Sequence, residues 1–173
     1  MRTAALLAAA LLVGGCASMD KPQCVNANWY AIGMEDGAQG RGLQRPGDHR
    51  RACAEHGVQP DAERYAAGRN EGLKSYCTYD RGFRAGRAGN AYHSVCPEPA
   101  ARDFLAGYQH GREVYGLQRR LDEVNADIKK TKASLAEPGI SPRARGQLAE
   151  RLEGLTREST YLEQQLAAAS RSR

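Results

Sequence analysis

One spacing of an aromatic residue and two glycines occurs four times in this chain, and it constrains the fold more than any other feature. In each copy the glycines follow the aromatic residue by three and by seven positions. Such positions share one face of an α-helix, and small residues four apart let two helix backbones approach closely. The four units are Tyr30-x-x-Gly33-x-x-x-Gly37, Tyr65-x-x-Gly68-x-x-x-Gly72, Tyr79-x-x-Gly82-x-x-x-Gly86 and Phe104-x-x-Gly107-x-x-x-Gly111.

We expect these glycines to lie inside helices that pack on one another, with the aromatic rings packed over the glycines. Each glycine costs a helix about 0.8 to 1.0 kcal/mol relative to alanine, so the helices need support from packing and from cross-links. Turns are the alternative, but the units contain no proline. Helix starts are indicated at Pro60-Asp61 and Pro97-Glu98-Pro99, and loops or helix ends at Gly42, Pro46-Gly47 and Asn90.

Four cysteines fall in the same region, namely Cys24, Cys53, Cys77 and Cys96. Zinc sites usually take cysteines in closely spaced pairs, whereas the gaps here are 29, 24 and 19 residues. We therefore expect two disulfides, no metal and no cofactor. Three pairings are open, and Cys24 with Cys53 and Cys77 with Cys96 is favoured, because each loop then closes around one predicted helix. Disulfides that respond to redox stress are a further hypothesis.

The first twenty residues indicate an export signal followed by a lipid anchor. Arg2 precedes an apolar run over residues 3–13, which is too short to span a membrane. The sequence Val13-Gly14-Gly15-Cys16 resembles the lipobox of bacterial lipoproteins, in which the cysteine is lipidated and becomes the first mature residue. Ala17 stands where Asp would favour retention in the inner membrane, so the resemblance implies the periplasmic face of the outer membrane. An ordinary secretory signal with a chance cysteine is the alternative.

A longer pattern joins the aromatic-glycine units to the cysteines. It runs from Trp29-Tyr30-x-x-Gly33-x-x-Asp36-Gly37-x-x-Gly40 through Cys53, Asp61-x-x-x-Tyr65-x-x-Gly68-Arg69-x-x-Gly72-Leu73-x-x-Tyr76-Cys77, Gly82-x-x-x-Gly86 and Tyr92 to Val95-Cys96. This pattern resembles a family of small bacterial lipoproteins classed as domain of unknown function 2799, over about residues 24–116. The resemblance implies a lipoprotein address and a glycine-rich, cysteine-bearing domain, but no activity.

The C-terminal part predicts an antiparallel coiled-coil hairpin. Apolar or small residues recur at steps of three and four in two segments, which Glu137-Pro138-Gly139 separates. Ser141 is placed to cap the second helix, with Pro142 at its first position. Such a hairpin buries one seam per helix, so it could dock a partner, form a homo-oligomer or fold back on the preceding domain. The two seams are Val114, Leu117, Leu121, Val124, Ile128, Thr131 and Leu135, then Leu148, Leu152, Leu155, Ser159, Leu162 and Leu166.

Charge and histidine placement argue against several functions. The 25 basic and 20 acidic residues are spread along the chain, so no strongly basic arm predicts nucleic-acid binding. The histidines form no metal-binding motif, and we expect them at the surface. Two local basic clusters could touch anionic lipid or cell-wall groups, although solvated faces are commoner. The histidines are His49, His56, His93 and His110; the clusters are Arg41, Arg45, His49, Arg50 and Arg51 in a predicted loop, and Arg81, Arg84 and Arg87 along a helix.

Together these features predict a mainly α protein, in which a small disulfide-stapled, glycine-rich helical domain precedes the coiled-coil hairpin. The expected function is that of an outer-membrane-anchored periplasmic lipoprotein that binds or scaffolds an envelope protein or a cell-wall polymer, without catalysis. An envelope enzyme that acts on cell-wall or lipid substrates through Asp36, Arg69 or Glu71 is the alternative. The expected segments are a signal peptide over 1–15, a lipidated tether over 16–23, the helical domain over 24–113 and the hairpin over 114–173.

Overall fold

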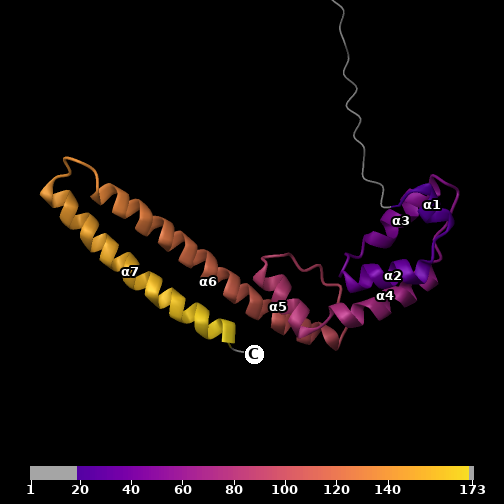
Figure 1. Ribbon diagram of the computed structural model, residues 1–173. Coiled ribbons are helices and arrows are strands. Elements are labelled where there is room, and N and C mark those ends of the chain that lie inside the picture. Colours follow the sequence, from indigo (N-terminus) through magenta and orange to yellow (C-terminus); the bar gives the residue numbers. More distant parts are fainter. Residues whose placement is uncertain (1–18, 172–173) are drawn as a thin grey trace, which may run out of the picture.

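The computed structural model describes residues 19–171, and within them the chain forms helices and no strands, which confirms the mainly α prediction (Figure 1). Cys16, with the predicted signal peptide and anchor, lies outside the described residues. Among the described helices, none is long and apolar enough to cross a membrane. The helices are α1 (Lys21–Val25), α2 (Trp29–Ala38), α3 (Arg45–Ala54), α4 (Ala62–Tyr76), α5 (Tyr79–Arg87), α6 (Ala100–Leu135) and α7 (Pro142–Arg171).

Polar side chains fix where several of these helices begin. The side chains of Asn28, Asp61 and Thr78 accept hydrogen bonds from backbone N–H groups in the first turns of α2, α4 and α5. These bonds satisfy donors that have no partner inside the helix. The helix starts predicted at Pro60-Asp61 and Pro97-Glu98-Pro99 are confirmed, because α4 begins at Ala62 and α6 at Ala100.

The first two aromatic-glycine units form a tight parallel pair, α2 with α4. A Cβ atom placed on Gly33 would lie 2.1 Å from the carbonyl oxygen of Tyr65, and one on Gly68 would lie 1.9 Å from that of Tyr30. The contact continues one turn later, where Gly72 meets the carbonyl oxygen of Met34. Residue numbers rise together along both helices, so they run in the same direction.

The third and fourth units repeat this arrangement in α5 and α6. A Cβ atom on Gly82 would lie 2.0 Å from the carbonyl oxygen of Phe104, and one on Gly107 would lie 2.1 Å from that of Tyr79. We call α2 with α4 the first pair and α5 with α6 the second pair. Both pairs have the same register. In each, the first glycine of one unit faces the carbonyl oxygen of the aromatic residue of the other unit.

The predicted packing of rings over glycines is wrong. The glycines face backbone carbonyls of the partner helix, and a gap that excludes a Cβ atom has no room for a ring. The rings therefore lie beside the contact instead of within it. Tyr30 of the first pair remains 40% exposed, whereas Phe104 of the second pair is fully buried.

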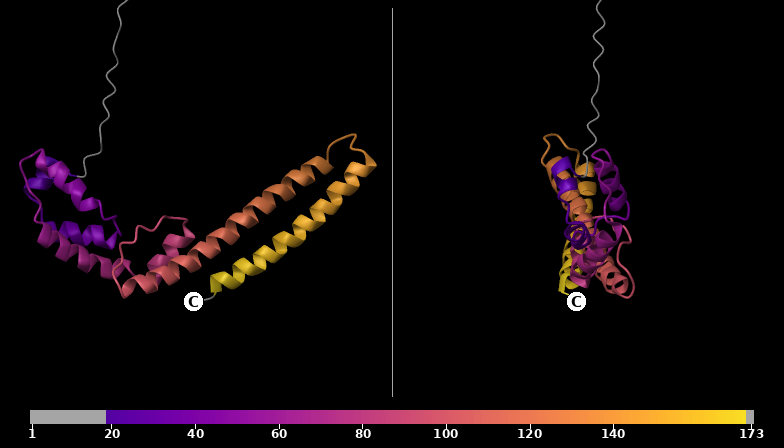
Figure 2. Two further views of the ribbon diagram at one scale, coloured as in Figure 1. Left: turned by 180° about the vertical axis from the view of Figure 1, so that it is seen from behind. Right: turned by 90° about the vertical axis from the view of Figure 1, so that its right-hand side faces the viewer.

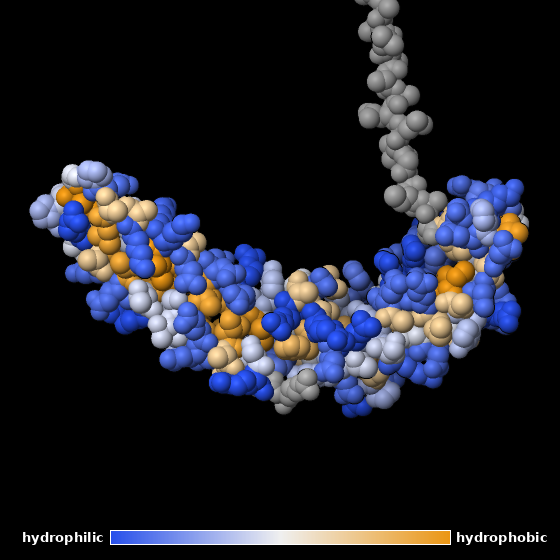
Figure 3. Space-filling model, viewed as in Figure 1, coloured by the Kyte–Doolittle hydropathy of each residue, from blue (hydrophilic) through white to orange (hydrophobic). Residues whose placement is uncertain are grey.

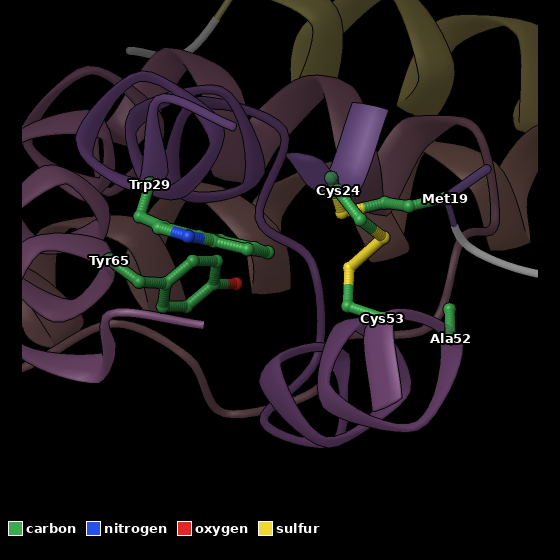
Figure 4. Packing of buried hydrophobic residues seen from close by; sticks show 6 residues of the cluster. All are labelled: Met19, Cys24, Trp29, Ala52, Cys53 and Tyr65. Atoms are coloured by element: carbon green, nitrogen blue, oxygen red, sulfur yellow. A yellow bond between two sulfur atoms is a disulfide. The ribbon is translucent and has the colours of Figure 1, made fainter. Parts of the chain in front are cut away.

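In each pair a disulfide joins the segment before the first helix to the connection that follows that helix. Cys24 of α1 is bonded to Cys53 of α3, and Cys77 at the end of α4 is bonded to Cys96 just before α6. This is the pairing that the sequence favoured. The first disulfide lies in a small core with Met19, Ala52, Trp29 and Tyr65 (Figure 4).

The C-terminal helices form the predicted antiparallel hairpin, which extends away from the helix pairs (Figure 2). Leu121, Val124 and Leu162 form its buried seam. Arg120 pairs with Glu158 at 2.7 Å across the two helices. Ser141 accepts a hydrogen bond from the backbone N–H of Ala144, as predicted for a cap.

The hairpin is not a unit separate from the glycine-rich helices, because the two share helix α6. Helix α6 belongs to the second pair at its start and to the hairpin at its end, and it runs unbroken across residues 113 and 114. The far end of α7 returns to the second pair, where the carbonyl oxygen of Ala169 lies 2.6 Å from His110 Nε2. Figure 1 shows the resulting crescent, with the first pair at one end and the hairpin at the other.

One predicted loop is a helix. Pro46 and Gly47 lie in the first turns of α3, although they were expected to interrupt the chain. Proline is tolerated in a first helical turn because the N–H that it lacks has no helical partner there. The basic residues Arg45, Arg50 and Arg51 therefore belong to a helix that packs beside the first pair.

Candidate functional site

A buried carboxylate lies at the centre of the first pair. Asp36 of α2 is 6% exposed. Its Oδ2 atom lies 2.8 Å from His49 Nε2 of α3 and accepts a 2.8 Å hydrogen bond from the hydroxyl of Tyr65 in α4. Its Oδ1 atom lies 3.6 Å from Arg45 Nε. One side chain thus connects three helices.

These partners keep the carboxyl group ionised. Burial by itself raises the pKa of Asp36, but hydrogen bonds from His49 and Tyr65 and the positive charges nearby outweigh it, so the pKa lies below its usual value. Burial and the adjacent carboxylate raise the pKa of the Tyr65 phenol well above its usual range. The cluster therefore pairs a stable anion with a phenol that stays protonated as a donor.

Arg69 adds a second, incompletely bonded cation to this region. Its side chain is 7% exposed, and its Nη2 atom donates to the backbone carbonyl of Arg41. Its Nη1 atom is buried and makes no hydrogen bond within residues 19–171. A buried donor without an acceptor costs about 1 to 3 kcal/mol. The guanidinium also lies close enough to the Tyr65 hydroxyl to oppose the rise in the pKa of that phenol.

A groove of about 1140 Å³ lies between α3 and α4, next to this cluster. Trp29, His49, Tyr65 and Arg69 contribute to its inner wall. The His49 ring lies between the other two rings in contact, with centroid distances of 6.4 Å to Trp29 and 5.9 Å to Tyr65. Its lining contains three arginines and, among the described residues, no aspartate or glutamate. The three arginines are Arg50, Arg51 and Arg69.

The second pair has the same backbone contact between its helices but no polar cluster corresponding to Asp36, His49 and Tyr65. Ala85 occupies the position in its unit that Asp36 occupies in the first, and Phe104 replaces Tyr65. No helix corresponds to α3 in its connection, which runs over residues 88–99. Phe104 is instead enclosed by aromatic rings, with centroid distances of 5.1 Å to Tyr76 and 4.6 Å to Tyr92.

Residues 28–113 match the family described as Protein of unknown function (DUF2799). This region belongs to the DUF2799 family. It contains both helix pairs and the polar cluster, and it ends inside α6, before most of the hairpin. Neither the comparison with curated proteins nor the comparison with solved structures gives a match.

Of the three residues in the enzyme hypothesis, the DUF2799 fold brings two together. Asp36 and Arg69 both lie beside Tyr65. Glu71 lies at the surface of α4, where it pairs with Lys74 at 2.6 Å. Within the described part of the chain, no group of three or more potential ligands is arranged to hold a metal ion.

The expectation that the histidines lie at the surface is wrong for His49, which is 3% exposed within the DUF2799 region. The sequence contains a signal for this placement. In a helix that begins near Pro46, positions 49, 52 and 53 lie on one face, and Ala52 and Cys53 are also buried. Assigning this segment to a loop hid that pattern.

Proposed function

We propose that this protein is a periplasm-facing lipoprotein, anchored in the outer membrane through Cys16, that binds or scaffolds another component of the cell envelope. The order Val13-Gly14-Gly15-Cys16 with Ala17 next supports the anchor. The two disulfides support an oxidising compartment, because such bonds persist there and are rare in a reducing cytosol.

The unbroken course of α6 is the observation that carries the scaffolding proposal. Its 36 residues correspond to about 54 Å at 1.5 Å per residue. The first part of α6 is clamped to α5 through Gly107 and Gly111, and the rest forms one arm of the hairpin. The hairpin is therefore held at a fixed angle to the glycine-rich helices, as a spacer or docking arm requires.

The hairpin has apolar surface to offer a partner. Two helices bury a single seam, and Leu117, Ile128, Leu155 and Leu166 remain only partly buried beside it. Figure 3 shows hydrophobic residues in a stripe along this part of the molecule, flanked by hydrophilic residues. A third helix from an envelope protein fits this surface by the same packing that joins α6 to α7.

We favour binding over catalysis because Asp36, the acidic side chain that is buried among residues 19–171, already has partners for both carboxylate oxygens. The Asp36 carboxylate accepts from His49 and Tyr65, and Arg45 lies beside it. A group held ionised by internal partners is suited to positioning side chains and helices. The enzyme alternative predicts that separate substitutions of Asp36, Arg69 and Glu71 abolish complementation of a deletion strain, whereas the binding proposal predicts that Glu71→Gln complements fully.

Photocrosslinking in cells tests the scaffold. A photoreactive residue at Lys129 or Tyr161 places a probe at an exposed position on each arm of the hairpin. The expected result is an adduct with one defined envelope protein, absent when the probe is at Lys74 on the first pair. Adducts only with a second copy of the chain, or none at either hairpin position, would contradict a docking role for the arm.

The anchor is tested separately. A Cys16→Ser variant is expected to lose membrane association and the mass of the attached lipid, while its two disulfides still form. Recovery of this variant in the outer-membrane fraction at the level of the unmodified chain would contradict the proposed anchor.

A further inference from the structure

We propose that the groove between α3 and α4 binds an anionic amphiphile, meaning a phosphate or carboxylate group attached to an apolar body. The inference concerns the first pair alone and holds whether or not the hairpin has a partner. It rests on three properties of the groove: its charge, its apolar lining and a buried donor in its wall.

The charge of the groove selects an anion. Arg50 is exposed at its edge and makes no ion pair within the described residues. Arg51 lies beside it and is partly neutralised by Asp48. Because no acidic side chain lines the groove, an anion that enters it meets positive charge without competing carboxylates.

The lining also selects an apolar group. Trp29 and Tyr65 contribute rings, and Ala54, Val58 and Ala66 contribute aliphatic surface. Leu43 lines the groove as well and is 70% exposed, so it adds aliphatic surface that a ligand can cover. A volume of about 1140 Å³ accommodates a small molecule or part of a lipid.

The wall of the groove contains the donor that makes it a site. Arg69 is more than nine-tenths buried, and its Nη1 atom lacks an acceptor among residues 19–171. A guanidinium binds a phosphate or carboxylate through two parallel N–H donors. An acidic group at the inner wall would lie beside the positive charge of the Arg69 guanidinium, and its apolar body would lie against Trp29.

The chain contains a built-in probe for this test. Trp29 is its single tryptophan and lines the groove, so the intrinsic fluorescence reports on that surface. The full chain is inserted in neutral phosphatidylcholine vesicles and titrated with hexyl phosphate. A saturable change is expected, with binding at least about tenfold weaker for 1-hexanol, which lacks the charge, and for inorganic phosphate, which lacks the chain.

Variants assign the effect to the groove. Arg69→Met is expected to weaken hexyl phosphate binding about tenfold or more, because it removes the positive charge at the inner wall of the groove. Since Arg69 is buried, Arg50→Gln provides a second variant at an exposed position, with a smaller expected loss. Arg84→Gln on α5 is the matched control, an exposed arginine of the second pair, and it is expected to bind as the unmodified chain does.

A last measurement, with anionic vesicles, distinguishes between two sources of the ligand. When part of the vesicle lipid is the anionic phosphatidylglycerol, a fluorescence change that Arg50→Gln reduces and Arg84→Gln leaves unaltered identifies a lipid headgroup as the ligand. A response to hexyl phosphate without a response to anionic vesicles identifies a free molecule. The proposal is overturned if neither probe changes the fluorescence, if hexanol binds as well as hexyl phosphate, or if the folded Arg50 and Arg69 variants bind as tightly as the control.

Discussion

The hydroxyl of Tyr65 donates a 2.8 Å hydrogen bond to the carboxylate of Asp36, across two helices whose backbones touch at glycines. The same carboxylate oxygen lies 2.8 Å from His49 on a third helix. Close backbone contact and a buried polar bond therefore act at the same place. The glycines set how near α2 and α4 lie, and Asp36 fixes α3 against them.

Stability is expected to fall in acid because of Asp36. Its pKa in the folded chain is below the unfolded value of about 3.9, so its contribution is complete above that pH and is lost as the pH falls through the lowered value. Urea unfolding between pH 7 and pH 2.5 measures this loss. Asp36→Asn is expected to be less stable at pH 7 and to lose less stability on acidification.

Glu163→Gln, at an exposed position on α7, serves as the control for the pH series. Its stability profile is expected to follow that of the unmodified chain. If Asp36→Asn loses as much stability on acidification as Glu163→Gln, the carboxylate does not provide the acid sensitivity assigned to it.

A double-mutant cycle is expected to show coupling between Tyr65 and Asp36. Tyr65→Phe removes a hydrogen bond to a charged acceptor, which is worth about 1.5 to 3 kcal/mol. The ring itself is tolerated, because Phe104 occupies the equivalent position of the second pair. In an Asp36→Asn background the same change is expected to cost less, about 0.5 to 1.5 kcal/mol. Equal costs in both backgrounds would show that the two side chains are not coupled.

Two glycines on the same helix are expected to respond to alanine in opposite directions. At Gly111 a Cβ atom would lie 2.2 Å from the carbonyl oxygen of Phe83, so Gly111→Ala is expected to cost about 3 kcal/mol or more. At Gly116 nothing lies within 4 Å, so Gly116→Ala is expected to add about 0.5 to 1 kcal/mol of helix stability. Thermal unfolding of both variants checks the pair, and a loss at Gly116 as large as that at Gly111 would contradict the close contact.

The two disulfides are expected to differ in their rate of reduction. Cys24 and Cys53 are 1% and 0% exposed, whereas Cys96 is only partly buried. A thiolate reagent must reach a sulfur atom, so Cys77–Cys96 is expected to be reduced first under mild dithiothreitol. Alkylation followed by mass spectrometry of the peptides measures the order. Earlier reduction of Cys24–Cys53 would contradict this expectation and indicate that the small core around this disulfide opens more readily than its burial suggests.

The helices could be predicted from the sequence because their signals are local, and the disulfides could be predicted because few pairings are possible. Four repeated units, capping residues such as Asp61 and the heptad seams each act within one or two turns. Four cysteines allow three pairings, and loop closure favoured the correct one. The parallel direction of the pairs was not predicted, since a stripe of glycines is compatible with either direction.

The candidate site was harder to predict because it depends on α3. Treating Pro46-Gly47 as a loop placed His49 and its neighbouring arginines at the surface, although one face of that segment is buried. Asp36 and Arg69 were noticed as potential functional residues, but nothing in a linear pattern indicates that Tyr65 hydrogen-bonds Asp36. Their juxtaposition follows from the register of α2 on α4, which the glycine contacts set.

The parallel direction of each pair also determines where this fold can vary. Two parallel helices oblige the chain to travel back along their length, but the contact between them does not depend on what that return segment contains. In the second pair the return segment is an irregular stretch over residues 88–99. In the first pair the corresponding segment, over residues 39–61, contains α3. The connection is thus a place where the chain can gain or lose a binding surface while the glycine-packed helices keep their geometry.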